Sequence, residues 1–227
     1  MIKIEKTSVM NFENAIRGAR NPLNSWDRMD STFYTADNVA IEDRYKIGEF
    51  ELGPNDLSLA RRLIKAGSDH RKFLRQIFVS VDITAPLYWW KEFDTYKVAT
   101  AANSCSTMHK IHAKEFTFDD FSHEHLYSRL GESYEAMDCL TDIIGCLNKY
   151  RSLYIETKDK MWWWQMIQLL PSSYNQLRTC TLNYETLLNQ YRARKHHKLD
   201  EWHTYCDWIE TLPYFKEMCL DGETDGE

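Results

Sequence analysis

The chain has 227 residues, of which 43% are hydrophobic and 27% charged, and its formal net charge is −6 at pH 7. This length suits one substantial domain, and no stretch approaches the roughly 20 apolar residues that span a bilayer. The net negative charge argues against an extended nucleic-acid surface, because affinity for phosphates comes mainly from clustered Lys and Arg.

The first quarter of the chain is expected to contain a strand, a loop region and a helix. Residues 1–5 alternate apolar and polar side chains as a strand does, and they lack the apolar core of a signal peptide. Residues 7–50 are polar and irregular, which predicts loops. Pro54 then begins a helix with apolar residues at helical spacing, and Gly67 is suited to end it.

The clearest strand covers residues 77–83, where apolar residues occupy every second position until Pro86 ends the strand. Helical spacing then returns in three segments. They run from Trp89 to Tyr96, from Tyr134 to Leu147, and around Trp162–Trp164 up to the Leu170-Pro171 pair.

A short strand is predicted at residues 177–182, followed by a helix with Asn183 as its N-cap. A final helix begins near Trp202, and the acidic, Gly-containing tail at 221–227 is expected to be disordered. Strands interrupted by long helices, without regular alternation or a GxGxxG turn, indicate one α+β domain over residues 1–220.

The helix after Asn183 carries most of the candidate ligand-binding residues. At roughly 100° per residue, Asn183, Asn189 and Arg194 do not share one narrow stripe. Composition alone favours a plain interpretation, in which Asn183 caps the helix, Asn189 lies at the surface and Arg194 belongs to a solvated basic face.

An ordered series in this part of the chain resembles the C-terminal half of flavin-dependent thymidylate synthases: Leu169-Leu170-Pro171, Thr181-Leu182-Asn183, Leu187, Asn189, Arg194, His197 and Trp202. In that family a Leu-Pro pair precedes a helix whose two asparagines approach the flavin and whose later arginine holds the pyrimidine nucleotide. The resemblance implies that Asn183 and Asn189 contact FAD and that Arg194 binds the nucleotide. A planar guanidinium fork suits phosphate or pyrimidine oxygens.

The family signature is altered in this chain. Family members carry Arg-His-Arg, seven residues and then Ser, after a strand and a Gln. Here the triplet reads Thr95-Tyr96-Lys97, and Glu92 lies near the position of the Gln. The family serine is matched by Cys105, or by Ser106 if the loop holds one extra residue, and the neighbouring Ser104 suits an anion-binding loop.

These matches give the candidate sites. The resemblance assigns cofactor binding to His70, Arg75, Lys97, Asn183 and Asn189; it assigns substrate binding to Glu92, Ser104, Cys105, Ser106 and Arg194, with Ser106 and Arg194 also catalytic. His70 and Arg75 belong to a basic group that precedes the strand, where the family has a histidine at the flavin site. A solvated surface role is the alternative for that group.

Cys105 and the His196-His197 pair suggest two further chemistries. A Cys105 thiol near Lys97 could attack an electron-poor pyrimidine carbon, but the resemblance implies that flavin carries the reductive chemistry and that Cys105 positions the loop. His196 and His197 are adjacent, so they point in different directions on a helix, and no metal site is predicted.

The resemblance implies an enzyme that methylates dUMP to dTMP with FAD, methylene-tetrahydrofolate and NADPH. It also implies a homotetramer and a curved, mainly antiparallel sheet flanked by long helices. Six scattered cysteines without CxxC pairs indicate reduced thiols in a cytoplasm, that of a bacterium or a viral host. The alternatives are a diverged relative that modifies another pyrimidine nucleotide, and a non-catalytic helical interaction protein, which the Trp clusters suggest.

Overall fold

The computed structural model describes residues 2–127 and 134–221, so most of the tail that was expected to be disordered lies outside the described residues. Contacts divide the chain into two compact units. The first comprises Met1–Glu5, Asp82–Tyr96 and Ala102–Thr179; the second comprises Lys6–Val81, Lys97–Ala101 and Cys180–Glu227.

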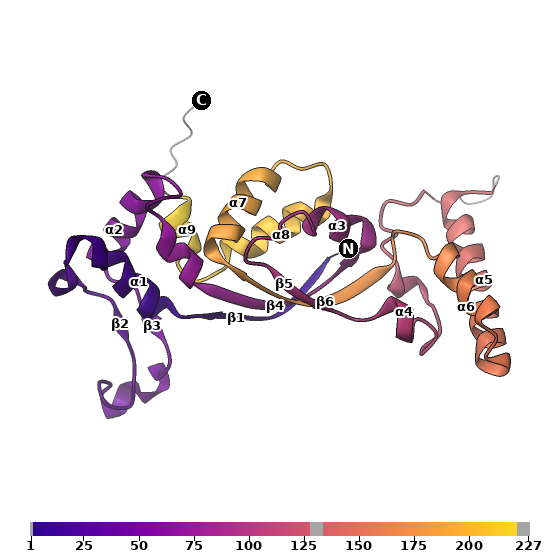
Figure 1. Ribbon diagram of the computed structural model, residues 1–227, viewed down its shortest axis with the longest axis horizontal. Coiled ribbons are helices and arrows are strands. Elements are labelled where there is room, and N and C mark those ends of the chain that lie inside the picture. The colour runs from indigo at the N-terminus through magenta and orange to yellow at the C-terminus, as the bar shows by residue number, and fades with distance from the viewer. Residues whose placement is uncertain (1, 128–133, 222–227) are drawn as a thin grey trace. The chain divides into compact units, whose positions relative to one another are not determined.

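Four strands form one sheet in the order β1-β4-β6-β5 (Figure 1). Their bounds are β1 Lys3–Met10, β4 Phe78–Pro86, β5 Ala101–Ser104 and β6 Asn175–Asn183. β4 and β6 run antiparallel, because the Tyr184 N–H donates to the Ile77 carbonyl at 3.1 Å and the Leu87 N–H donates to the Tyr174 carbonyl at 3.0 Å. The predicted strands in these two regions and the α+β class are therefore confirmed.

The second unit contains five α-helices among its described residues: α1 Phe12–Arg20, α2 Pro54–Lys65, α7 Tyr184–Arg194, α8 Asp200–Glu210 and α9 Phe215–Cys219. Its core is aromatic, since Tyr184, Trp202 and Tyr205 are fully buried. α2, α7 and α8 confirm the predicted helices.

α1 corrects the expectation that residues 7–50 form only loops. Phe12, Ala15, Ile16 and Ala19 are buried at the spacing of one helix face. The polar residues between them give the segment a polar average composition, which conceals this narrow apolar stripe.

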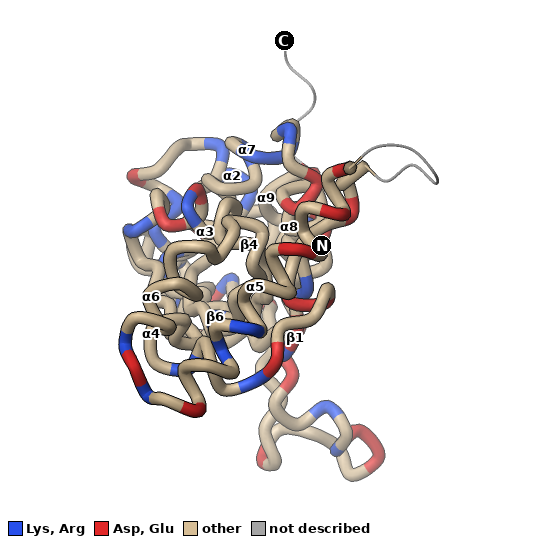
Figure 2. The backbone as a smooth tube through the Cα atoms, turned by 90° about the vertical axis from the view of Figure 1, so that its right-hand side faces the viewer, with Lys and Arg blue, Asp and Glu red and all other residues tan. Residues whose placement is uncertain are grey.

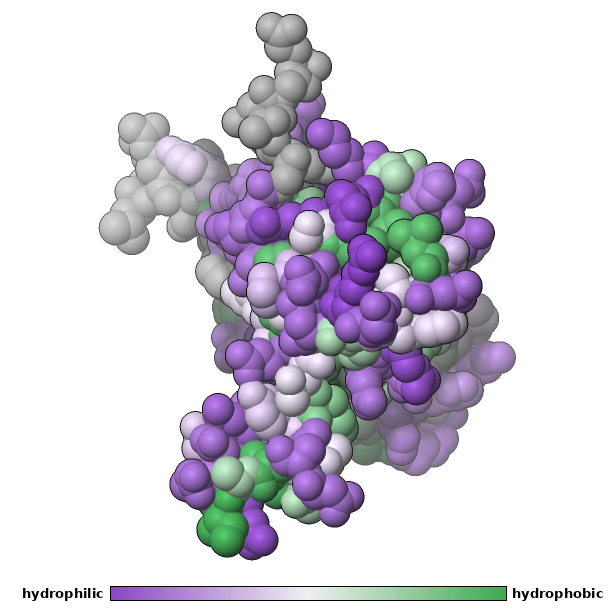
Figure 3. All heavy atoms as spheres, turned by 90° about the vertical axis from the view of Figure 1, so that its left-hand side faces the viewer, coloured by the Kyte–Doolittle hydropathy of each residue, from purple (hydrophilic) through white to green (hydrophobic). Residues whose placement is uncertain are grey.

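An antiparallel hairpin of β2 Thr32–Phe33 and β3 Phe50–Glu51 follows α1. Apolar side chains gather towards its far end (Figure 3), where Ile41 is 78% and Ile47 is 45% exposed.

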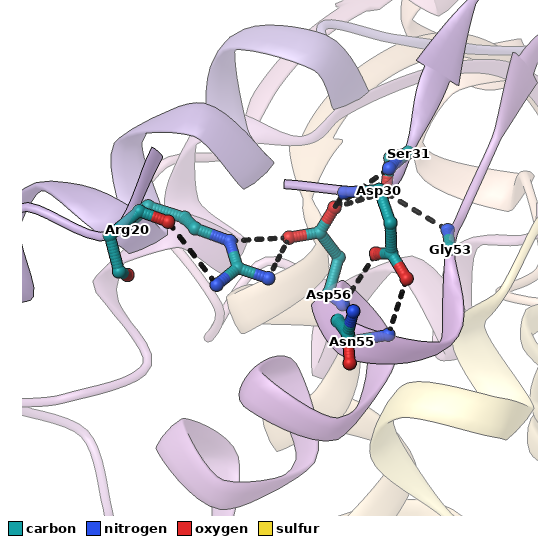
Figure 4. A network of polar contacts seen from close by, with 7 residues as sticks. Arg20, Asp30, Ser31, Gly53, Asn55 and Asp56 are labelled. Carbon is teal, nitrogen blue, oxygen red and sulfur yellow. Dashed lines mark hydrogen bonds and ion pairs between the residues drawn. The ribbon is translucent and has the colours of Figure 1, made fainter. Parts of the chain in front are cut away.

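The base of the hairpin is held by a buried polar network (Figure 4). Asp56 pairs with Arg20 at 2.6 Å and accepts hydrogen bonds from the Ser31 N–H and hydroxyl. Asp30 accepts from the N–H groups of Asn55 and Asp56 at 2.8 and 3.0 Å, which joins the hairpin to the first turn of α2. A side chain at Gly53 would collide with Asp30, so glycine is required there.

The first unit contains four α-helices in the described part of the chain: α3 Leu87–Phe93, α4 Thr107–Lys110, α5 Ala136–Thr157 and α6 Lys160–Leu169. α5 and α6 pack on each other around Leu147 and Met166, both fully buried. α3, α5 and α6 confirm the predicted helices, although α3 ends before Tyr96. Trp89 and Trp90 are both buried, whereas Trp164 is 42% exposed.

Candidate functional site

The first turn of α7 lies beside the segment that follows the altered triplet. The Asn183 side chain caps α7 by accepting from the Thr186 N–H at 2.9 Å, as the sequence predicted. The Thr186 hydroxyl donates to the Val98 carbonyl at 3.2 Å. The second unit therefore brings the loop of Lys97 to the helix that begins after Asn183, and Lys97 itself is exposed.

Asn189 is held by a buried ion pair on the same unit. Arg71 Nε donates to Glu185 Oε2 at 2.9 Å, and Arg71 Nη2 donates to Asn189 Oδ1 at 3.2 Å. The side chains of Arg71 and Glu185 are each only 10% exposed, whereas Asn189 is exposed. Because Oδ1 accepts from Arg71, the NH₂ group of Asn189 is presented as a donor.

Arg71 and Glu185 were not among the predicted site residues. The sequence places Arg71 in the basic group of His70 and Arg75, for which ligand binding and a solvated surface role are both open, and its partner Glu185 lies 114 positions away. The two predicted site residues of that basic group, His70 and Arg75, are exposed. Arg75 Nη2 donates to the Ser68 carbonyl at 3.4 Å.

Arg194 is the last residue of α7 and is half-buried. Its guanidinium carbon lies 4.8 Å from the centroid of the Trp202 ring, a cation–π contact that limits the motion of the side chain. Lys and Arg positions are frequent around this helix (Figure 2). A cation at the C-terminal end of a helix is also favoured by the helix dipole.

In the first unit, residues of β6 bond the backbone of Cys105, in the loop of Ser104–Ser106 that is predicted to bind the substrate. The Cys105 N–H donates to the Leu177 carbonyl at 2.9 Å, and the Cys105 carbonyl accepts from Gln176 Nε2 at 2.8 Å. Ser106 caps α4 by accepting from the His109 N–H at 3.0 Å. The side chains of Ser104, Cys105 and Ser106 are exposed.

Gln176 belongs to a polar chain that sequence reasoning missed. Its Oε1 accepts from Arg178 Nε at 3.0 Å, and Arg178 Nη1 pairs with Asp94 at 2.7 Å. The Arg178 guanidinium lies 4.2 Å from the Trp90 ring centroid, and the Trp90 Nε1–H donates to the Gln176 carbonyl at 2.9 Å. The alternation of β6 was the available signal, since it places Gln176 and Arg178 on one face.

The predicted residues therefore fall into two groups. His70, Arg75, Lys97, Asn183, Asn189 and Arg194 belong to the second unit, whereas Glu92, Ser104, Cys105 and Ser106 belong to the first unit. Glu92 lies on α3 and is half-buried. Within residues 2–127 and 134–221, no helix is long and apolar enough to cross a membrane, and no three His, Cys, Asp or Glu are arranged to hold a metal.

Comparisons with known proteins found similarity in structure only. No protein-family model and no curated protein sequence matches the chain. The thymidylate synthase ThyX of Helicobacter pylori, solved with FAD and dUMP, superposes with a TM-score of 0.65 over 98% of this chain and 99% of that chain, at 14% identity. The UMP/dUMP methylase PolB of Streptomyces cacaoi, bound with 5-Br UMP, gives 0.60 over 93% and 87%, at 13% identity.

This chain consequently has the fold of flavin-dependent thymidylate synthases over almost its whole length, and the predicted fold resemblance is confirmed.

Proposed function

From a fold shared with flavin-dependent thymidylate synthases, we propose that this chain is an FAD-binding enzyme that methylates the uracil ring of dUMP. The structural neighbours were solved with FAD and dUMP or with brominated pyrimidine nucleotides. The observation that carries the proposal is that Asn183, Asn189 and the segment of Lys97 all lie at helix α7, within one unit of that fold.

The residues of the second unit fit a flavin nucleotide. Asn189 presents an amide donor that suits a ring carbonyl or nitrogen, and the exposed cation of Lys97 suits a phosphate. Thr100, in the same segment as Lys97, has a buried hydroxyl oxygen for which the described residues provide no hydrogen-bond partner. A buried hydroxyl of this kind is expected to bind a ligand or water.

When bound, a reduced flavin supplies the hydride that reductive methylation requires. Arg194, restrained by Trp202, would grip a phosphate or pyrimidine oxygen. The Ser106 hydroxyl accepts from the His109 N–H and keeps its own proton for donation to the nucleotide. The fixed Cys105 backbone positions this loop, and no protein nucleophile is needed.

We include in the proposal the co-substrates and assembly that the family resemblance implies. These are methylene-tetrahydrofolate as carbon donor, NADPH as hydride source, a homotetramer and a cytoplasmic location. They rest on the resemblance alone.

The proposal is tested first on the purified protein. We expect a yellow protein with a flavin absorbance, or one that takes up added FAD, and we expect it to restore growth of thymidine-requiring cells. A colourless protein that takes up no FAD contradicts the proposal.

The nucleotide site is tested with Arg194→Ala. Loss of a charged hydrogen bond should weaken dUMP binding by about tenfold or more, while the fold measured by circular dichroism is retained. Lys198→Ala is the matched control, because Lys198 is an exposed cation a few residues further on. Equal dUMP affinity in the Arg194 variant means that the site is placed wrongly.

A second candidate is methylation of another pyrimidine nucleotide, such as UMP. Two observations favour it: the similarity to PolB, and a signature triplet, Thr95-Tyr96-Lys97, that keeps only one cation. Failure of complementation, together with a methylated UMP product identified by mass spectrometry, would select this candidate. The third alternative is an interaction protein, and of the Trp clusters that suggest it, Trp89 and Trp90 are buried whereas Trp164 is 42% exposed.

A further inference from the structure

A pocket of about 710 Å³ lies in the second unit and is lined by the start of α1, the β2–β3 hairpin and the residues before α9. Aromatic rings form part of its wall. Phe12 stacks on Phe50 with ring centroids 5.2 Å apart, and Tyr214 packs edge-on against both rings. The volume suits a small organic ligand, since ligand pockets commonly measure about 300–1,000 Å³.

The charges on the wall have one sign. The described residues that line the pocket include Glu13, Glu49 and Glu217 but no Lys, Arg or His. Among the contacts of residues 2–127 and 134–221, none of these three carboxylates has an ion pair or a hydrogen bond. Two cations outside the lining contact it: Arg61 Nε donates to the backbone carbonyl of Glu217 at 2.7 Å, and Arg17 Nη2 donates to the side chain of Asn14 at 2.7 Å.

The wall is also preformed. Tyr214 has a left-handed backbone with φ of 56°, a conformation that a tyrosine rarely adopts. Tyr214 is fixed by a 3.0 Å hydrogen bond from its hydroxyl to the Phe50 carbonyl, and Phe12 packs edge-on against the fully buried Tyr184. Strained backbone of this kind persists only where the surroundings fix it, and it concentrates at functional sites.

We infer that this pocket binds a small organic cation with a planar apolar body, the chemistry of an aromatic amidine or amine. Aromatic faces attract cations, and the three carboxylates add full negative charges. The N-terminus of α1 opposes this preference with about half a positive charge, which is smaller than the carboxylate total. The inference does not depend on the proposed methylation, because it uses none of the residues assigned to that reaction.

The test is calorimetric titration of the full chain with three probes of the same shape. Benzamidine carries a positive charge, benzamide is neutral and benzoate is negative. We expect benzamidine to bind at a single site, more weakly at high salt, benzamide to bind less well and benzoate not to bind. No heat with benzamidine, or equal affinity for benzamide, overturns the inference.

Single substitutions of acidic residues then test whether benzamidine binds in this pocket. Glu13→Gln and Glu49→Gln each remove one charge from exposed positions, so the variants should fold, and each should weaken benzamidine by roughly fivefold. Glu42→Gln is the control, because Glu42 is an exposed acid of the hairpin outside the pocket. If Glu42→Gln weakens binding as much as Glu49→Gln does, binding follows the net charge of the protein and the pocket assignment is wrong.

Discussion

Arg71 donates a 3.2 Å hydrogen bond to Asn189 Oδ1 and thereby determines which way the Asn189 amide faces. The same guanidinium is held by Glu185 at 2.9 Å, so the orientation of an exposed amide depends on a buried ion pair. An amide that is fixed in this way recognises an acceptor atom on a ligand, such as a ring carbonyl oxygen. This relationship gives the proposed flavin site a consequence that can be measured.

Arg71→Lys should lower FAD affinity while Glu185 keeps a cationic partner. A lysine ammonium lacks the planar fork that bonds Glu185 and Asn189 together, so the Asn189 amide can rotate. We expect a loss of about tenfold in FAD affinity, measured by flavin fluorescence, without a comparable fall in melting temperature. Arg62→Lys is the control, since Arg62 is an exposed arginine of α2 that belongs to no predicted site. Similar losses in both variants would mean that the effect is not specific to the Arg71–Asn189 hydrogen bond.

The stability of the Arg71–Glu185 pair is tested separately. Arg71→Met leaves the Glu185 carboxylate buried without its partner, which should cost about 3–5 kcal/mol in the free energy of unfolding. The double variant Arg71→Met with Glu185→Leu should recover most of this loss, because apolar pairs often replace buried ion pairs at little cost. Chemical denaturation measures both. A single variant as stable as the wild-type chain would mean that Glu185 finds water or another partner.

Asn183→Ala should destabilise the protein by about 1 kcal/mol, because the first turn of α7 loses the side chain that accepts from the Thr186 N–H. Asn183→Asp should retain most of the stability, since Asp caps helices equally well. Arg192→Ala is the comparison within the same helix, because Arg192 is exposed and lies in the last turn of α7, away from the cap. Thermal unfolding of the three variants separates the role of Asn183 in the cap from any role in binding.

The helices and strands with strong periodicity were predictable from the sequence. The alternation of β4 and the Asn183 cap depend on neighbouring residues, and local chemistry specifies both. α1 was missed because its apolar stripe is narrow, and β2 and β3 were missed because each contains only two residues. The hairpin depends instead on Asp30 and Asp56, whose partners are distant in sequence.

The candidate site was predicted only in part, for a related reason. Asn183, Asn189 and Arg194 could be proposed because the family pattern is continuous along one helix. Arg71 could be named only as one of a basic group and Gln176 not at all, because their contacts lie 118 and 71 positions away. No local pattern distinguishes an arginine that will be buried from one that will be solvated.

Gln176→Leu should weaken nucleotide binding more than Cys105→Ala does. Gln176 anchors the Cys105 carbonyl and accepts from Arg178, so its loss frees the loop that carries Ser106. The Cys105 side chain is exposed, and the contacts that hold this residue come from its backbone, which alanine retains. Titration with dUMP and circular dichroism of both variants check the expectation. Lost activity in Cys105→Ala with intact dUMP binding would instead favour a reactive thiol.

The hairpin network should make stability depend on acid pH through Asp30. Burial raises the pKa of Asp30, but the N–H groups of Asn55 and Asp56 outweigh it and lower that pKa below 3.8. A depressed pKa stabilises the folded state above pH 3.8, and this contribution is lost as the pH falls through the folded-state value. The unfolding free energies of the wild-type chain and Asp30→Asn should therefore differ most at about pH 6, and the difference should shrink as the pH falls below 3.8. A constant difference across this range would mean that the stabilisation by Asp30 does not depend on the charge of its carboxylate.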